Sequence, residues 1–393
     1  MMTNRPSLQH AKPQSGFTLI EIMVGMVIAL IGVVVMMNVY SNFENQKRTT
    51  TGAGDAQNNG AVALFMIQRD IEQAGYGITT PALMGCSLDL RTGVTLPLLA
   101  PVVINPSTAV VPAGDANTDT LLVFYGNPNG QTDGHLITTA GPTGASTATQ
   151  WDVATPSSFV VNDLVITTPF PRPSPCSLAV DTVMGVNSTT VITSTGQPAA
   201  NFPKSTNVGT LFNLGNSVNG NMYHVAAYAI RNGDLTMCDY VANNCGDPAQ
   251  VANSAVWMSI GNNIVSMKAQ YGRDDSTVNP SPMNGIVNLF DKTTPAATAG
   301  CEWARIESVR LALVARNTQP NKSAVTLAAP VWFGSVGAAP AGILPGNVAD
   351  PIDLTGTNAS LLSGTSWANY RYKVFQTTIP LRNIVMKGVP SGC

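Results

Sequence analysis

One apolar run near the N-terminus constrains this chain more than any other feature. Residues 17–37 read FTLIEIMVGMVIALIGVVVMM, in which Thr18 and Glu21 are the conspicuously polar members. A helix of this length, at about 1.5 Å per residue, crosses a hydrocarbon layer of about 30 Å. The run therefore predicts a membrane-spanning helix, which we place at residues 17–39.

A polar leader precedes this run. Residues 1–16 read MMTNRPSLQHAKPQSG, carry Arg5 and Lys12 but no acidic residue, and end in Gly16. A secretory signal differs, because its apolar stretch is shorter and its cleavage site lies on the far side of that stretch. The basic leader favours a cytoplasmic N-terminus, but basic residues also follow the helix, so charge alone leaves the orientation open.

Glu21 lies inside the apolar run. A carboxylate there costs roughly 2.5–3.5 kcal/mol on insertion scales and normally has a partner. Cleavage after Gly16 would place a new α-amine on Phe17, one helical turn from Glu21. This amine could pair with the carboxylate within the chain or in a neighbouring subunit. We therefore expect Gly16, Phe17 and Glu21 to act together in processing and pairing.

The segment GFTLIE at residues 16–21 resembles the prepilin signal of type IV pilins and of type II secretion pseudopilins. The resemblance implies that a prepilin peptidase cuts between Gly16 and Phe17, and that the new N-terminal Phe17 is N-methylated. It also implies that Glu21 guides docking into a filament.

Three small residues follow within the predicted helix, namely Gly25, Ala29 and Gly32. Their spacings of four and three would let helix backbones approach closely, which predicts helix packing along this stripe. Glycine is also common in membrane helices, so the sequence leaves both explanations open.

A second helical pattern follows the polar stretch after Tyr40. An apolar stripe recurs at helical spacing at Leu64, Ile67, Ile71 and Ala74. It predicts that the stem helix continues over residues 40–76 and stops at the glycines that follow. Gly52, Gly54 and Gly60 each weaken a helix by about 1 kcal/mol, so we expect a softened stretch near residues 50–60.

The remaining chain is predicted to be a β-rich head spanning residues 77–393. Short apolar runs are separated by turn residues, which is typical of strands. The expected strands cover residues 120–125, 159–168, 208–214, 222–230, 264–271, 305–315 and 370–381. Residues 126–157, 276–300 and 334–366 are predicted as loops or small insertions. The predicted fold class is α+β and pilin-like, with a long N-terminal helical stem packed on an antiparallel sheet and large loop insertions.

Several segments of the stem and head resemble the PilW family of minor type IV pilins. These segments are residues 67–76, 119–125, 264–274, 305–316 and 370–383. The resemblance implies a minor pilin that primes pilus assembly at or near the tip and supports pilus biogenesis, twitching motility, adhesion or DNA uptake. It implies other minor pilins, the major pilin and a tip adhesin as partners. It also implies a single-pass inner-membrane protein with a periplasmic head, later located in the cell-surface pilus.

The six cysteines form an even set without a C-x-x-C pair, which favours disulfides over zinc or redox motifs. They are Cys86, Cys176, Cys238, Cys245, Cys301 and Cys393. Their connectivity is open from sequence. The close pair Cys238 and Cys245, which flanks a turn-like Asn-Asn dipeptide, suggests a local bridge.

Catalytic and metal-binding motifs are missing from the sequence. His135 and His224, the histidines beyond the leader, have no metal-binding spacing, and a P-loop would need a Gly-Lys dipeptide that the chain lacks. The segment 215–219 lacks the final glycine of a nucleophile elbow. We therefore expect no catalytic residue, no cofactor and no enzyme. The net charge of -2 also disfavours direct nucleic-acid binding.

Two acidic loops were weighed as calcium sites. They contain Asp115, Asn117 and Asp119, and Asp274, Asp275 and Ser276. Neither completes the glycine and glutamate pattern of an EF-hand, so ordinary turn acids are the favoured interpretation and no metal site is predicted.

Three alternative functions stay open from sequence alone. A J-type pseudopilin of a type II secretion system would share the N-terminal device and a similar head. A membrane-anchored envelope enzyme could use an unrecognised loop site. The head could also be a ligand-binding adhesin.

Overall fold

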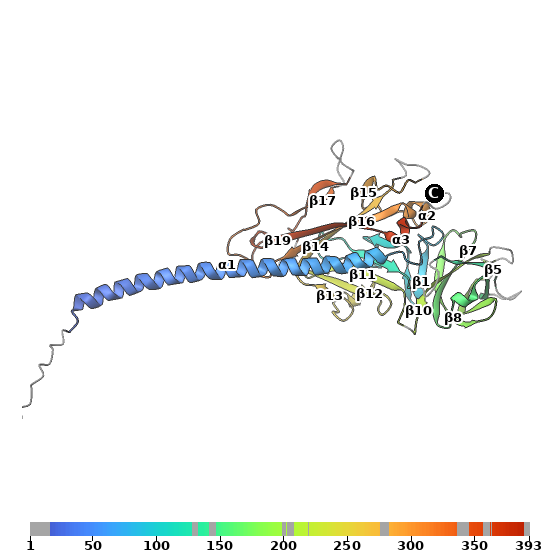
Figure 1. Cartoon of the computed structure of the whole chain (residues 1–393), viewed down its shortest axis with the longest axis horizontal. Helices are drawn as coiled ribbons and strands as arrows, with labels where there is room; N and C mark the ends of the chain where they lie inside the picture. The colour runs from blue at the N-terminus through green and yellow to red at the C-terminus, as the bar shows by residue number, and fades with distance from the viewer. Residues whose placement is uncertain are drawn as a thin grey trace, which may run out of the picture. The chain divides into compact units, whose positions relative to one another are not determined.

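The computed structural model describes residues 16–127, 133–140, 147–198, 202, 208–218, 220–275, 283–335, 346–356, 362 and 364–388. The chain divides into two compact units, Met1–Ala53 and Gly54–Cys393. The first long element is helix α1 (Leu19–Gln73), and it contributes residues to both units. We describe each unit by itself (Figure 1).

The first unit consists, in its described part, of the N-terminal portion of α1. Its large apolar side chains are exposed throughout, from Phe17 and Leu19 to Tyr40 and Phe43. Its most apolar 18-residue window has a mean hydropathy of 2.8 and no buried residue. Among the described residues, α1 is the one helix long and apolar enough to cross a membrane. A helix in this state requires lipid or other helices around it.

The second unit buries one face of the remaining α1 residues. Ile67, Ile71 and Ala74 are fully buried, as the apolar stripe predicts, whereas Leu64 is only half-buried. Ala63 and Gly60 extend the same buried face toward the N-terminus. Because these positions recur at helical spacing, the face forms one continuous contact with the head.

The expectation of a softened stretch near residues 50–60 is wrong. Helix α1 is continuous through Gly52, Gly54 and Gly60. At Gly60 the reason is packing, since a Cβ there would lie 2.1 Å from the Cε2 atom of Phe375. The glycine lets helix and sheet approach closely, so its low helix propensity does not mark a break.

The strands of the second unit follow in chain order. They are β1 (Ser87–Arg91), β2 (Val94–Leu96), β3 (Val102–Ile104), β4 (Leu121–Tyr125), β5 (His135–Ala140), β6 (Thr147–Val153), β7 (Asp163–Pro169), β8 (Ser177–Val186), β9 (Thr190–Pro198), β10 (Gly209–Asn216), β11 (His224–Arg231), β12 (Asp234–Asp239), β13 (Met258–Gly261), β14 (Ile264–Arg273), β15 (Leu289–Asp291), β16 (Ile306–Arg316), β17 (Val331–Ser335), β18 (Val348–Pro351) and β19 (Tyr372–Pro380). Two short helices complete the list: α2 (Gly300–Ala304) precedes β16, and α3 (Arg382–Val385) follows β19.

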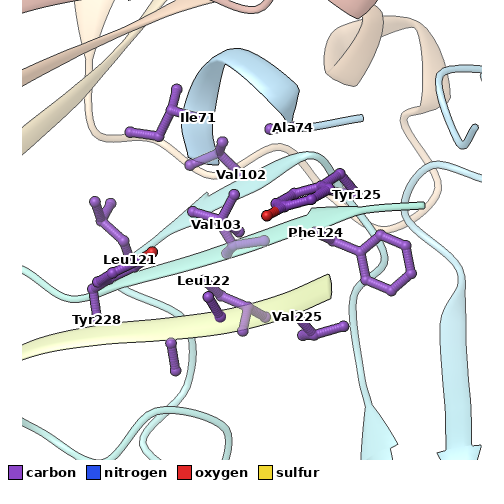
Figure 2. Close-up of a cluster of buried hydrophobic side chains, with 14 of the residues drawn as sticks. Ile71, Ala74, Val102, Val103, Leu121, Leu122, Phe124, Tyr125, Val225 and Tyr228 are labelled. Atoms are coloured by element: carbon purple, nitrogen blue, oxygen red, sulfur yellow. The ribbon is translucent and has the colours of Figure 1, made fainter. Parts of the chain in front are cut away.

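Two antiparallel sheets form the part of the head that contacts α1. One has the order β13-β12-β11-β4-β3 and the other β15-β14-β16-β19. Figure 2 shows Ile71 of α1, and Ala74 just after the helix, close to Val102 and Val103 of β3, in one cluster of buried side chains. The observed architecture is a long helix followed by a largely β head, in agreement with the predicted α+β class.

A third group of strands forms a closed ring. The pairings run β8-β7-β10-β5-β6-β9, and β9 pairs back with β8. The ring has its own apolar core around Trp151, Val165 and Leu211. In Figure 1 the labelled members β5, β7, β8 and β10 gather together, coloured green to yellow-green. The hairpin β1–β2 joins the ring through a parallel pairing of β1 with β8.

The seven expected strands are all present, as β4, β7, β10, β11, β14, β16 and β19. The predicted loop at residues 126–157 is wrong in part, because it contains β5 and β6. In β6 the buried residues Ala148, Trp151 and Val153 are unevenly spaced, and the register shifts between Ala148 and Gln150. A bulge of this kind breaks the period of two on which the expectation rested.

The other two predicted loops also contain regular structure. β15 and α2 lie in or at the end of residues 276–300, and β17 and β18 overlap residues 334–366. Both regions are otherwise irregular where the structure describes them.

Two disulfides link described residues. Cys238 bonds Cys245 with an S–S length of 2.05 Å, and Cys86 bonds Cys176 across 90 residues. Cys301 is also disulfide-bonded. Cys393 lies outside the described residues.

Candidate processing and assembly segment

The predicted cleavage position lies on an accessible segment. Phe17 is 85% exposed, and a Cβ on Gly16 would meet nothing within 4 Å. Helix α1 begins only at Leu19. The bond between Gly16 and Phe17 therefore lies in non-helical backbone, the state that a peptidase requires of its substrate. The leader before Gly16 lies outside the described residues.

Thr18 and Glu21 form a capping box at the start of α1. The backbone N–H and the hydroxyl of Thr18 each donate to Oε2 of Glu21 at 2.9 Å. The backbone N–H of Glu21 donates to the Thr18 hydroxyl at 3.4 Å. This reciprocal arrangement satisfies helix donors that would otherwise have no partner. It holds the carboxylate beside Phe17, where the new α-amine would form.

The sequence interpretation missed the role of Thr18. The signal was present, because Thr18-Leu19-Ile20-Glu21 has the T-x-x-E pattern of a capping box. Glu21 thus has a structural partner before any α-amine exists. The pairing with the Phe17 amine stays a prediction.

Gly25, Ala29 and Gly32 lie on one face of α1, since they are separated by four and three residues. All three are exposed, and a Cβ on either glycine would meet nothing within 4 Å. The stripe is therefore open to another helix, while the packing itself stays a prediction.

The C-terminal turns of α1 carry a buried acid. Asp70 is 6% exposed, and the hydroxyl of Tyr228 on β11 donates to its Oδ2. Burial, reinforced by this neighbouring carboxylate, raises the pKa of Tyr228 well above its usual value. Burial and the same carboxylate raise the pKa of Tyr125 to about 12. Both phenols therefore stay protonated at neutral pH, and Tyr228 remains a donor to Asp70.

Helix α3, which follows β19, helps to fix the end of α1. The side-chain amide of Asn383 donates to the backbone carbonyls of Gln73 and Ala74 at 3.0 and 3.1 Å. The N–H of Gly75 donates to the carbonyl of Phe124 at 2.8 Å. Residues far apart in sequence thus provide hydrogen-bond partners for the last carbonyl groups of the helix and for the backbone that follows it.

Several segments that resemble the PilW family therefore meet at the end of α1. The stem segment 67–76 contacts segment 119–125 through Gly75 and segment 370–383 through Asn383. Segment 119–125 is joined to segment 264–274, because Asp119 accepts from the N–H of Ala269 at 2.9 Å. The sequence did not predict the roles of Asp70, Tyr228 and Asn383, since their partners lie more than a hundred residues away.

The two acidic loops weighed as calcium sites have structural partners. Asp119 also accepts from the Lys292 ammonium at 2.6 Å, and Asp115 accepts from the N–H groups of Asn232 and Gly233 at the β11–β12 turn. Asp274 is buried and accepts from backbone N–H groups of the following loop. Ser276 lies outside the described residues. In the part of the chain that the structure describes, no group of three His, Cys, Asp or Glu side chains could hold a metal ion.

The two histidines have local roles. His135 is buried, stacks edge-on with Phe159, and its Nδ1 lies 2.6 Å from the Thr155 hydroxyl; burial lowers its pKa. His224, the first residue of β11, stacks on Tyr125. Four of the five tryptophans are buried and Trp367 packs against a core cluster, so they act as core anchors.

Comparison with known families gives two matches. Residues 227–383 match the family described as Type IV Pilus-assembly protein W, and residues 11–37 match the prokaryotic N-terminal methylation motif. No curated protein and no solved structure matches the chain significantly. The first match begins one residue before Tyr228 and ends at Asn383, so it includes both of these partners of α1. The second covers residues 16–21 and the whole apolar run at residues 17–37.

These families point to a structural protein that interacts with other pilins and the pilus machinery. The methylation motif and the exposed apolar helix fit membrane anchoring followed by location in a pilus. The resemblance found in the sequence is confirmed: residues 227–383 are similar to the PilW family, and residues 11–37 carry the N-terminal methylation motif of prepilins.

Proposed function

We propose that this chain is a non-catalytic minor pilin that primes type IV pilus assembly and lies at or near the pilus tip. The observation that carries the proposal is the arrangement at residues 16–21, followed by an apolar stretch of α1 in which no residue is buried. Such a helix is compatible with lipid before assembly and with neighbouring helices afterwards.

The steps of assembly follow from this arrangement. The chain sits in the inner membrane as a single span with its head in the periplasm. A prepilin peptidase cuts between Gly16 and Phe17, and Phe17 is N-methylated. The Glu21 carboxylate then pairs with an N-terminal amine, which fixes the register of the incoming subunit. The stripe of Gly25, Ala29 and Gly32 packs against neighbouring pilin helices.

The head favours a place at the tip. In the described residues it contains four sheets, one of which includes the ring of β5–β10 that lies before the region matched to the pilus-assembly family. A subunit with so large a head would be hard to repeat along a shaft. Other minor pilins, the major pilin and a tip adhesin are the proposed partners, and support of twitching motility, adhesion or DNA uptake follows from pilus extension.

Glu21→Gln tests the docking step. The amide preserves shape but removes the charge, so the variant should be processed normally, insert in the membrane and yield few pili. Thr18→Ala is the matched control, because it removes one capping hydroxyl and keeps the carboxylate; it should leave pilus number close to wild type. Wild-type piliation by Glu21→Gln would refute the docking role. Normal pili with lost protein secretion in the deletion strain would instead support the J-type pseudopilin.

A further inference from the structure

A groove lies in the head at the point where strand β8 changes its pairing partner. Along one edge of β8, the pairing with β1 ends at Ala179, which lies opposite Asp89. The pairing with β9 on that edge begins only at Val183, which lies opposite Thr193. Residues 180–182 between these pairings are joined to β7 on the opposite edge. The gap between the β1–β2 hairpin and β9 opens into a groove of about 700 Å³. This volume is in the range of sites for small ligands.

The groove has one fixed cation. The Nη1 atom of Arg91 donates to the carbonyls of Tyr240 and Val241 at 2.6 and 2.9 Å. None of the hydrogen bonds within the described part of the chain uses its Nε or Nη2. The guanidinium is therefore held in place while keeping donors available on an exposed side chain.

One carboxylate lies beside this cation in the groove lining, and a second is buried behind the wall. Asp89, two residues before Arg91, accepts from the hydroxyl of Thr95 at 2.5 Å. Asp181 on β8 is 2% exposed, and its Oδ1 accepts from the N–H of Thr195 at 3.0 Å, behind the groove wall. Its Oδ2 is buried and has no partner among the described residues. Asp181 is not among the residues that line the groove, so it supports the wall and does not contact a ligand there.

The remaining lining combines hydroxyls with apolar carbon. Hydroxyl and amide groups come from Thr92, Thr95, Thr182, Ser194, Thr195 and Gln197. Leu164, Val180 and Met222 supply an apolar wall. Asp89 and Arg91 are the charged members among the described lining residues, so their charges cancel. The groove thus offers donors, acceptors and an apolar surface without net charge.

We infer that this groove binds a neutral saccharide. Sugar hydroxyls both donate and accept, so one ring can meet the Arg91 donors, the Asp89 carboxylate and the threonine hydroxyls together. The C–H face of the ring suits the apolar wall. A sulfated or sialylated ligand carries a negative charge. The Asp89 carboxylate near the Arg91 guanidinium would repel that charge, which disfavours binding of such a ligand. The inference does not depend on the pilus assignment, because every residue it uses lies in the head.

The test uses the full chain in phospholipid nanodiscs, because sugar-based detergents would compete for the groove. The probe is an array of neutral, sialylated and sulfated oligosaccharides, followed by titration of the bound compounds in solution. Neutral compounds should bind. Thr182→Tyr should fill the groove and weaken binding by at least about tenfold, as should Asp89→Asn combined with Arg91→Lys.

Thr138→Tyr is the matched control, since it makes the same change at an exposed position on β5 outside this groove. It should bind like wild type. Far-ultraviolet circular dichroism and melting curves of each variant verify folding. The inference is overturned if neutral compounds do not bind at millimolar concentration, if only sialylated or sulfated compounds bind, or if folded groove variants bind like the control.

Discussion

The side-chain amide of Asn383 donates a 3.0 Å hydrogen bond to the backbone carbonyl of Gln73, a residue 310 positions earlier in the chain. The last turn of a helix leaves carbonyl groups without intrahelical partners, and here a residue after the final strand satisfies them. The end of the stem and the end of the head are therefore fixed to each other.

Asn383→Ala should remove both hydrogen bonds and destabilise the head by about 1 kcal/mol. The loss should be local, so amide exchange near the end of α1 should quicken more than exchange in β14. Arg382→Ala is the control, because the Arg382 ion pair with Glu72 is largely exposed and should contribute less. Equal effects of the two changes, or no change in exchange near Gln73, would argue against a capping role for Asn383.

Gly60→Ala should destabilise the head although alanine is the better helix former. The added methyl would overlap the Phe375 ring, and overpacking of this kind costs about 1–3 kcal/mol. Gly54→Ala is the matched control, since a Cβ there meets nothing within 4 Å and should stabilise by about 0.5–1 kcal/mol. Thermal melting of both variants measures the difference. Stabilisation by Gly60→Ala would show that close approach is not the reason for this glycine.

Glu307 predicts a pH dependence of stability. Burial, with a smaller contribution from the Asp274 carboxylate, raises its pKa to about 7 from a usual value of 4.5. Because the folded state holds this proton more tightly than the unfolded state, its contribution to stability falls as pH rises from about 4.5 to 7. Glu307→Gln removes the titration and keeps the shape.

The melting temperature of Glu307→Gln should exceed that of wild type by a few degrees at pH 8, and the difference should shrink toward pH 4.5. A difference that is constant across this range would contradict the raised pKa.

The sequence predicted the elements whose pattern is local. The apolar run, the Ile67–Ile71 stripe and the seven strands all rest on short-range periodicity, and each is present. The hairpin of β11 and β12 was missed although Asn232-Gly233 is a turn signal of the two-residue kind. Both residues have positive φ in the structure. This signal was available and unused.

Other features lay beyond single-sequence reasoning. The ring of β5–β10 depends on pairing between distant strands, and the bulge in β6 hides its alternation. The role of Asp70 depends on Tyr228, and that of Asn383 on Gln73, so neither can be found from neighbouring residues. The groove beside β8 arises from a change of strand partners, which leaves no mark in composition. The N-terminal methylation motif could be recognised from the sequence because its residues are contiguous.

The mature N-terminus tests the central claim most directly. Intact pili should be purified and the N-terminal peptide of this chain analysed by mass spectrometry. The account predicts that the peptide begins at an N-methylated Phe17, and that replacing Gly16 by a larger residue leaves the leader attached. A chain in assembled pili that still begins at Met1, or one that begins at Phe17 but never occurs in a filament, would contradict it.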